Sequence, residues 1–270
     1  MTSYLKDFQF GVGVPCRGEA ILHSVNRILD EKRNLNSMSM LLVNFRNDFN
    51  LVDRSSMLCA VRLKCPSLYR WVEFCYASPA KLYYGTSILS SSQGVQKGDS
   101  LGPLIFALTL HAIVLKISQQ CKLDLKAWYL DDGTIIGDTI IVSKAFHIIK
   151  SEGVSVGLDL NIHKIELFWP SFDESSTQVG VFPADIGRPS VGVELLGGPV
   201  SLDTSFCNQL VLDKVHKTTQ LMDVVHRIHD PQSELLLLRN CAGGNSCPVI
   251  VQVMVCYNTG LSLYLYEMVS

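Results

Sequence analysis

The sequence predicts an α+β fold, and three observations support this prediction. Apolar and polar residues alternate over 123–129 and a β-prone run occupies 134–136, so a hairpin is expected with the acidic pair 131–132 near its turn. Short strand candidates flank glycines at 82–89 and at 193–200. Apolar stripes at helical spacing separate these strands, as expected when helices pack against a sheet.

The remaining elements follow from the same patterns. The segment 8–14 has no upstream structure to pack against, which suggests a truncated domain. Asp53 is a plausible helix cap, and Pro66 is expected to end the helix that Asp53 begins. The expected elements, in chain order, are a helix with apolar residues from Ile21 to Leu29, a strand at 38–43, a helix from Asp53 to Pro66, short strands at 82–84 and 88–89, a helix at 104–118, the hairpin around 131–132, a helix at 139–152, a strand at 165–169, a strand pair or tight turn at 193–200, helices that begin near 204 and near 235, and a loop at 240–248.

Length and composition fit a folded chain rather than a disordered one. The 270 residues are 47% hydrophobic and 18% charged, which is enough apolar material for a sizeable core. The formal net charge is -2 and the sequence pI is about 6.4. Since the chain has no overall basic excess, any surface that binds nucleic acid must be local.

Cysteine usage predicts an intracellular protein, in the nucleus or the cytoplasm. The nine cysteines are an odd number, are scattered and form no Cys-x-x-Cys pair, so neither a disulfide framework nor a zinc site is expected. One set could be imagined as zinc ligands, but its spacing fits no common zinc finger. That set is His226, His229, Cys241 and Cys247.

No segment is expected to enter a membrane. The first ten residues carry Lys6 and Asp7 and do not resemble a signal peptide. The apolar run 104–114 is interrupted by His111 and is too short to span a bilayer. Polar residues also interrupt the run 249–269, where a buried helix is expected instead.

The adjacent carboxylates Asp131 and Asp132 are the first candidate for a chemical site. Carboxylates held close together attract divalent cations, and Mg²⁺ prefers carboxylate and phosphate oxygens, so the pair suits phosphoryl chemistry. Because successive strand residues point to opposite faces, at most one of the two is expected to face a shared metal squarely. Asp-Asp-Gly is also an ordinary turn signal. A haloacid-type phosphatase would need its nucleophile at Leu130, so that interpretation fails.

A polar loop with two glycines, at 91–100, is the second candidate. It leads into the apolar helix expected at 104–118, and free N–H groups at a helix start can bind phosphate or base edges. The loop lacks the Lys-Ser/Thr ending of a P-loop, so an ATPase is not indicated.

Four motifs in this order together resemble the reverse transcriptases of non-LTR retrotransposons, as found in many eukaryotic and especially plant genomes. The resemblance covers roughly residues 8 to 245. The motifs are Gln93-Gly94-Val95-Gln96-Lys97-Gly98-Asp99-Ser100-Leu101-Gly102-Pro103-Leu104, Tyr129-Leu130-Asp131-Asp132-Gly133, Gly157-Leu158-Asp159-Leu160-Asn161-Ile162-His163-Lys164 and Leu195-Leu196-Gly197-Gly198-Pro199.

The resemblance implies a right-hand polymerase palm, which is an antiparallel sheet with helices on one face, together with truncated fingers and a partial helical thumb. The implied domains are a remnant of the fingers at 1–37, the palm at 38–202, and a partial thumb with a weakly matching C-terminal tail at 203–270. The implied activity is RNA-directed DNA polymerisation, a nucleotidyl transfer that uses an RNA template, a DNA primer or an RNA–DNA hybrid, and deoxynucleoside triphosphates.

The same resemblance implies residue roles. In this chemistry two Mg²⁺ ions stabilise the attacking and leaving oxygens, and the family holds them with an aspartate on the first palm strand and the aspartates of the hairpin. By resemblance, Asp131 is the main metal ligand and Asp132 the supporting one. Contact with template or nucleotide is assigned to Gln93, Gly94 and Tyr129. Phe49 packs against the sugar and Lys164 protonates the leaving pyrophosphate, while the primer end is steadied by Leu196, Gly197 and Gly198.

The chain departs from the family pattern at the first palm strand. Asn44 stands where an aspartate is expected, and a neutral amide with one metal-capable oxygen is a weaker ligand than a carboxylate with two. Asp48 occupies a position that is usually alanine, and it would lie about 13 Å from Asn44 along a continuing strand, so it is not expected to substitute. Ser100 replaces the usual proline, and the basic triphosphate-binding residues of the upstream fingers are missing. We therefore expect a catalytically degenerate protein, a pseudoenzyme whose Mg²⁺ binding is weakened.

Two alternatives stay open at this point. The chain could be a non-catalytic remnant that still binds RNA or an RNA–DNA hybrid, although its net negative charge argues against strong binding because phosphate neutralisation supplies much of the affinity. It could equally be the product of a decayed element with no selected role. The sequence does not separate these two alternatives, and it does not predict an oligomeric state.

Overall fold

The computed structural model describes residues 2–13, 17–33, 35, 37–171 and 180–237. The chain divides into two compact units, the first of which contains Met1–Ile21 and Glu31–Ser190, and the second Leu22–Asp30 and Val191–Ser270. The predicted domain boundaries after residues 37 and 202 refer to parts of a polymerase rather than to compact units, and they stay predictions.

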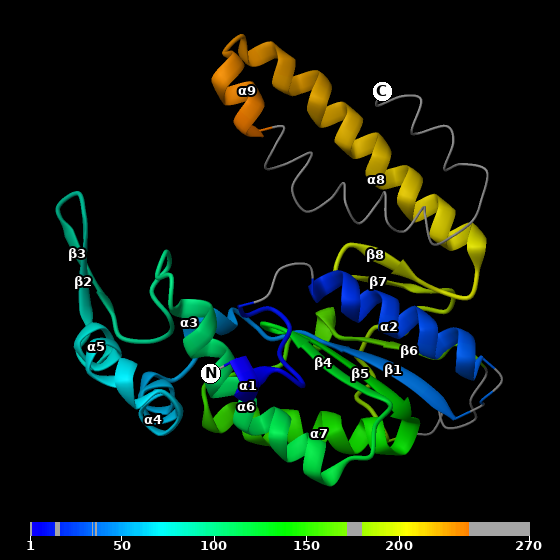
Figure 1. Ribbon diagram of the computed structural model, residues 1–270, viewed down its shortest axis with the longest axis horizontal. Coiled ribbons are helices and arrows are strands. Elements are labelled where there is room, and N and C mark those ends of the chain that lie inside the picture. Colours follow the sequence, from blue (N-terminus) through cyan, green and yellow to red (C-terminus); the bar gives the residue numbers. More distant parts are fainter. Residues whose placement is uncertain (1, 14–16, 34, 36, 172–179, 238–270) are drawn as a thin grey trace. The chain divides into compact units, whose positions relative to one another are not determined.

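Helices alternate with antiparallel strands in the first unit (Figure 1). This mixture agrees with the predicted α+β class. Its elements, in chain order, are α1 (Thr2–Leu5), the two ends of α2 (Arg17–Lys32), β1 (Met38–Val43), α3 (Asp48–Leu51), α4 (Arg54–Lys64), α5 (Pro66–Tyr76), β2 (Ala80–Tyr84), β3 (Ser87–Ser91), α6 (Gly102–Gln120), β4 (Leu125–Tyr129), β5 (Asp132–Asp138), α7 (Thr139–Ser155), the 3-10 helix η1 (Ile162–Lys164) and β6 (Glu166–Phe168).

Four antiparallel strands form the central sheet of this unit in the order β4-β5-β1-β6. The pairing of β1 with β5 aligns Val43 with Gly133, and the pairing of β4 with β5 aligns Tyr129 with Asp132. The β4–β5 turn therefore lies at the same end of the sheet as the C-terminal end of β1. The hairpin predicted around 131–132 is confirmed.

The segment before α2 pairs with β4 at the edge of the sheet. The Trp128 N–H donates a hydrogen bond to the Phe8 carbonyl (2.8 Å), and the Phe10 N–H donates one to the Trp128 carbonyl (2.7 Å). The segment thus finds its partner far downstream in the sequence. A pattern read along the chain could not show this pairing, because the two segments meet only in the folded protein.

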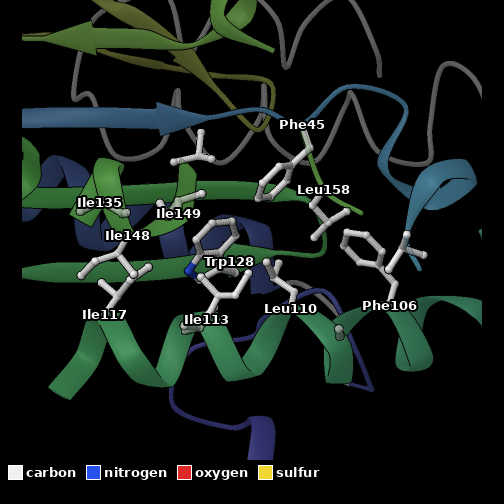
Figure 2. Close-up of a cluster of buried hydrophobic side chains, with 14 of the residues drawn as sticks. Phe45, Phe106, Leu110, Ile113, Ile117, Trp128, Ile135, Ile148, Ile149 and Leu158 are labelled. Carbon is white, nitrogen blue, oxygen red and sulfur yellow. The ribbon is translucent and has the colours of Figure 1, made fainter. Parts of the chain in front are cut away.

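One face of the sheet packs against α6 and α7, which lie side by side (Figure 1). Figure 2 shows Trp128 pointing from β4 toward α6, near Leu110 and Ile113. Trp128 is completely buried, and a Cβ atom at its cross-strand partner Gly133 would lie 2.6 Å from the ring. The indole therefore fills the space that a side chain at Gly133 would need, and this packing fits only one strand register.

Helix α6 is longer than the apolar run that predicts it. Among the residues that the structure describes, it is the helix that is long and apolar enough to cross a membrane, and 61% of its apolar window is buried within the protein. A helix that is apolar on all sides is typical of a protein core. Its burial against the sheet explains its composition.

Most of the other expected elements are confirmed, with small shifts at their ends. Asp53 caps α4 as expected, because its carboxylate accepts a hydrogen bond from the Ser56 N–H at 2.7 Å. Pro66 ends α4 but also begins α5, since a proline at the first helical position gives up no intrahelical hydrogen bond. The expectations for 240–248 and for 249–269 lie outside the described residues.

The strands β2 and β3 form a hairpin that projects beyond α5 (Figure 1). This hairpin confirms the short strands predicted around Gly85. Its large apolar side chains are exposed, namely Leu82, Tyr83, Tyr84, Ile88 and Leu89.

The second unit contains a small hairpin and two further helices. Its elements are the middle of α2, β7 (Val193–Leu195), β8 (Gly198–Val200), α8 (Thr204–Val225), the 3-10 helix η3 (His226–Ile228) and α9 (Pro231–Leu237). Leu196 and Gly197 form the β7–β8 turn with φ angles of 48° and 87°, which is the pattern of a type I′ hairpin turn. The strand pair predicted at 193–200 is therefore confirmed. A side chain at Gly198 would collide with Leu22 of α2.

His111 is a buried histidine in the core of the first unit, and it makes the free energy of unfolding depend on pH. It lies in α6, it is 1% exposed, and its ring packs against Tyr4 with 4.4 Å between ring centroids. Burial lowers the pKa of His111, so the native state keeps it neutral at a pH where the unfolded chain already carries a proton. Below the ordinary histidine pKa of about 6.5 the unfolded state binds more protons, and the free energy of unfolding should fall as the pH drops.

We expect the substitution His111→Phe to remove this acid-dependent loss. From about pH 7 to pH 5, the difference in unfolding free energy between the two proteins should move in favour of the variant by up to about 1.4 kcal/mol per pH unit. Urea unfolding at several pH values measures this, with His147→Phe on the exposed side of α7 as the matched control. Parallel pH profiles for His111→Phe and the unsubstituted chain would contradict the prediction.

Candidate functional site

The two adjacent carboxylates occupy a tight turn and the first position after it. Leu130 and Asp131 form the two-residue β4–β5 connection, and Asp132 begins β5. Leu130 has a φ of 59°, which a two-residue hairpin loop requires and which a branched side chain rarely adopts. The surrounding structure must therefore hold this turn in place.

Gln9 holds the turn through the backbone of Leu130. Its Oε1 accepts a hydrogen bond from the Leu130 N–H at 2.8 Å, and its Nε2 donates one to the Leu130 carbonyl at 3.2 Å. The Gly11 N–H donates a further bond to the same Oε1 at 3.2 Å. Gln9 is 3% exposed, so these bonds form away from water. This side chain positions the strained residue next to Asp131.

The residue after β1 lies beside this turn. Continuing the β1–β5 register by one position brings Asn44 opposite Asp132. On its other side, the Asn44 carbonyl accepts a hydrogen bond from the Asn161 N–H at 2.9 Å, and Phe45 forms a bridge with Leu160. The predicted ligand position therefore lies between the acidic turn and the segment that leads to η1. Lys164 ends that segment and is exposed.

The separation of about 13 Å expected between Asn44 and Asp48 does not apply, because its condition is not met. It assumed that β1 continues, but the strand ends at Val43 and Asn47 adopts a left-handed conformation with a φ of 48°. The chain turns there, and Asp48 begins α3 with its side chain facing Asp131. Burial, followed by the charge of Asp131 and a hydrogen-bonding contact with its carboxyl group, raises the pKa of Asp48 to about 6.

The surroundings of Asp132 also change its pKa, although the residue is exposed at the surface. Neighbouring protein atoms displace part of the water around its carboxylate, and together with the charge of Asp131 this raises the pKa of Asp132 to about 6. The charge of Asp131 thus acts on both Asp48 and Asp132 at the end of the sheet. Each would gain from a nearby positive charge.

The donor set fits a divalent cation only in part. In the part of the chain that the structure describes, no group of three or more His, Cys, Asp or Glu side chains is arranged to hold a metal ion. The Oδ2 atom of Asp48, however, is buried without a hydrogen-bond partner. Mg²⁺ is commonly held by one or two carboxylates, with water and phosphate oxygens as the remaining ligands. A pair of carboxylates with one unpartnered oxygen fits that kind of site.

The polar loop 91–100 is bound to the segment that follows Asp48. The Val95 N–H donates to the Phe49 carbonyl at 2.6 Å, and the Gly94 N–H donates to the Val52 carbonyl at 3.0 Å. Gly94 has a φ of 67°, and a side chain there would collide with the backbone of Asn50. The glycine therefore allows the loop to approach α3 closely. Phe49 itself stacks on Phe106 of α6, with 4.4 Å between ring centroids.

Arg54 fixes the conformation of the same loop. It is 7% exposed, and its guanidinium donates to the carbonyls of Ser91 (2.7 Å), Gln93 (3.2 Å) and Gly94 (3.0 Å) and to the Ser91 hydroxyl (3.0 Å). It also lies over the ring of Tyr76, 5.3 Å from the centroid. The planar guanidinium satisfies several loop carbonyls at once, which a lysine could not do. The side chain of Gln93 stays exposed above this framework.

The structure thus brings most of the predicted site residues into one region of the first unit. Asn44, Asp131 and Asp132 gather at the end of β1, Phe49 and Gly94 are joined by the loop bonds, and Tyr129 is the exposed residue just before the turn. Leu196, Gly197 and Gly198 belong to the second unit, so their relation to the acidic turn stays a prediction.

Sequence reasoning missed two residues that position the site. Gln9 precedes the first recognised motif, and Arg54 follows a helix cap, so neither belongs to a motif. No sequence signal identifies either role, because the groups that each side chain binds lie far away in the chain.

We expect Gln9→Ala to destabilise the acidic turn. The variant leaves the Leu130 N–H and carbonyl without partners in a buried place, which should cost roughly 1–3 kcal/mol of unfolding free energy. Urea unfolding measures the loss, and hydrogen exchange should show faster exchange of the Leu130 amide. The exposed residue Gln119 in α6 provides the control Gln119→Ala, which should change neither quantity. Unchanged exchange at Leu130 in Gln9→Ala would show that the side chain does not hold the turn.

Comparison with known proteins supports the fold. The sequence matches no protein-family model, and no curated protein matches it. Among solved structures, the chain is similar to apo telomerase from Candida tropicalis, with a TM-score of 0.52 and 12% identity, covering 73% of this chain and 36% of that one. It is also similar to telomerase from Candida albicans in complex with a TWJ fragment of telomeric RNA, with a TM-score of 0.52 and 11% identity, covering 94% of this chain and 44% of that one.

These similarities concern the fold alone, because the identities are low. The chain spans less than half the length of either telomerase. The similarity shows that the fold of this chain is like that of part of these telomerase structures.

Proposed function

We propose that this chain is a reverse-transcriptase palm, derived from a non-LTR retrotransposon, in which nucleotidyl transfer is lost. The observation that carries the proposal is the acidic turn beside the end of β1, with Asn44 at the position where the polymerase chemistry needs a carboxylate. The retrotransposon origin rests on the four ordered motifs. The similarity of the fold to telomerase supports a polymerase ancestor.

The residues suit cation binding better than catalysis. Asp131 and Asp132 would hold Mg²⁺, which when bound stabilises the charge that develops on phosphate oxygens during nucleotidyl transfer. The fit rests on the carboxylates at the turn and on the unpartnered oxygen of Asp48. Asn44 contributes no charge at the end of β1, so the site lacks electrostatic attraction where a second ion would be held. Nucleotidyl transfer needs both ions, and its loss follows from this missing charge.

The binding of substrates is proposed on the same basis. The loop that carries Gln93 and Gly94 would contact template or nucleotide, Phe49 would pack against the sugar, and Lys164 would approach the leaving pyrophosphate. The partners would be an RNA template with a DNA primer, or an RNA–DNA hybrid, and deoxynucleoside triphosphates. An intracellular location, in the nucleus or the cytoplasm, would follow from these partners. It is compatible with the cysteines among the described residues that form no disulfide, namely Cys59, Cys65, Cys75, Cys121 and Cys207.

We expect the purified chain not to extend a DNA primer on an RNA template with Mg²⁺ or Mn²⁺. The physical reason is the neutral side chain of Asn44 in a site that must concentrate positive charge. Incorporation of labelled nucleotide is the measurement, with Asp131→Asn as the background control. Template-dependent extension above that background would refute the loss of catalysis. The substitution Asn44→Asp alone should restore little activity, because it adds one metal ligand but no basic contact to the triphosphate.

A second function, nucleic-acid binding without catalysis, is favoured by the loop at 91–100. Arg54 holds this loop through four hydrogen bonds although the ligand position at Asn44 has changed. A binding loop that is already ordered pays less conformational entropy when a ligand arrives. The exposed side chains of Gln93 and Lys97 would then be available to a nucleic-acid strand.

We expect weak, saturable and salt-dependent binding of an RNA–DNA hybrid. Few phosphates can be neutralised by a chain with a net charge of -2, so the salt dependence should be shallow. Fluorescence anisotropy across a series of salt concentrations measures it. The variant Lys97→Gln should weaken binding and reduce the salt slope by up to about one unit, whereas Lys150→Gln on α7 is the control. Binding without saturation, or with no salt slope, would remove this second function.

A further inference from the structure

Asp48 and Asp131 present two carboxyl groups to each other. Their side chains lie within hydrogen-bonding reach, and the charge of Asp131 acts on Asp48. Ionised carboxylates are acceptors only, so two of them cannot form a hydrogen bond directly. A proton shared between them, or a cation bound by both, is required to make the contact favourable.

The unpartnered oxygen indicates where such a cation would lie. Asp48 is 9% exposed, and its Oδ2 atom is buried with no hydrogen-bond partner. A buried carboxylate oxygen without a partner costs free energy, and such atoms are rare in folded proteins. Because the rest of the side chain faces Asp131, an ion that satisfies this oxygen would lie next to the acidic turn.

The local backbone explains why Asp48 reaches this place. β1 ends at Val43, and the left-handed conformation of Asn47 turns the chain so that α3 begins at Asp48. The hydrogen bond from Val52 to the Asp48 carbonyl (2.9 Å) closes this helical turn. Both the turn at Asn47 and the turn at Leu130 therefore place a carboxylate at the same end of the sheet.

We propose that Asp48 replaces the missing carboxylate at Asn44 and, together with Asp131, binds one divalent cation. The inference rests on the proposed palm and deepens it, since it assigns to this chain a cation site of its own. It does not require that the chain polymerises nucleotides.

The chemistry of the site favours a hard cation. Carboxylate oxygens suit Mg²⁺ and Mn²⁺, which bind one or two protein carboxylates and complete their octahedral shell with water. Asp132 is exposed beside Asp131, so it adds negative charge to the site from the solvent side. The neutral Asn44 contributes no charge, and a single ion rather than a pair is the expected occupancy.

The experiment is a titration of the full chain with Mn²⁺ in the absence of nucleic acid and nucleotide. Electron paramagnetic resonance counts free Mn²⁺, and a thermal melt with and without Mg²⁺ provides an independent readout. The expected result is one Mn²⁺ per chain, displaced by excess Mg²⁺. The affinity should fall by about tenfold or more in Asp48→Asn and in Asp131→Asn, because each variant removes one charged ligand. Asp185→Asn, at an exposed aspartate away from the site, should leave the affinity unchanged.

A structural effect of Asp48→Asn can be separated from the loss of a ligand. An amide at position 48 removes the repulsion from Asp131, so the metal-free variant should melt at or above the temperature of the unsubstituted chain while losing the rise that Mg²⁺ produces. If Asp48→Asn binds Mn²⁺ as tightly as the unsubstituted chain, Asp48 is not a ligand. If the unsubstituted chain binds no Mn²⁺ stoichiometrically, the proposal is overturned.

A different experiment tests the proposed loss of catalysis. Primer extension by the unsubstituted chain would refute that loss and would leave the Mn²⁺ titration as it is. Absence of Mn²⁺ binding would refute the role of Asp48 and would leave the primer-extension result as it is.

Discussion

The pairing of β1 with β5 is the constraint on which the candidate site depends. This register aligns Val43 with Gly133 and so brings the end of β1 beside the acidic turn. The completely buried ring of Trp128 occupies the space above Gly133, and a shift of the strands by one residue would turn that ring away from α6. Core packing on one face of the sheet therefore determines which side chains meet at its end.

Two features of the acidic turn are energetically unfavourable in the folded protein. One is the left-handed conformation of Leu130. The other is the burial of carboxylates, which together with the charge of Asp131 raises the pKa of Asp48 and of Asp132. Gln9 offsets the first feature through its bonds to the Leu130 backbone. A cation between Asp48 and Asp131 would offset the second.

The framework beside the acidic turn depends on contacts that do not involve its carboxylates. Arg54 donates hydrogen bonds to the loop 91–100, and Phe49 packs on Phe106. These hydrogen bonds and apolar contacts do not require a metal ion, so the stability of the framework and the chemistry of the carboxylates are separable.

The sequence by itself determined the α+β class, the hairpin that carries Asp131 and Asp132, the capping of α4 by Asp53 and the ordered motifs, because these features depend on local patterns of a few residues. It did not determine that Gln9 holds the turn across 121 positions of sequence, or that Arg54 fixes a loop about forty residues downstream. It did not determine where Asp48 lies, because a strand pattern gives the rise per residue but not the place where the chain turns. The tertiary structure decided that, through the left-handed Asn47, which lets a residue four positions after Asn44 face the same turn.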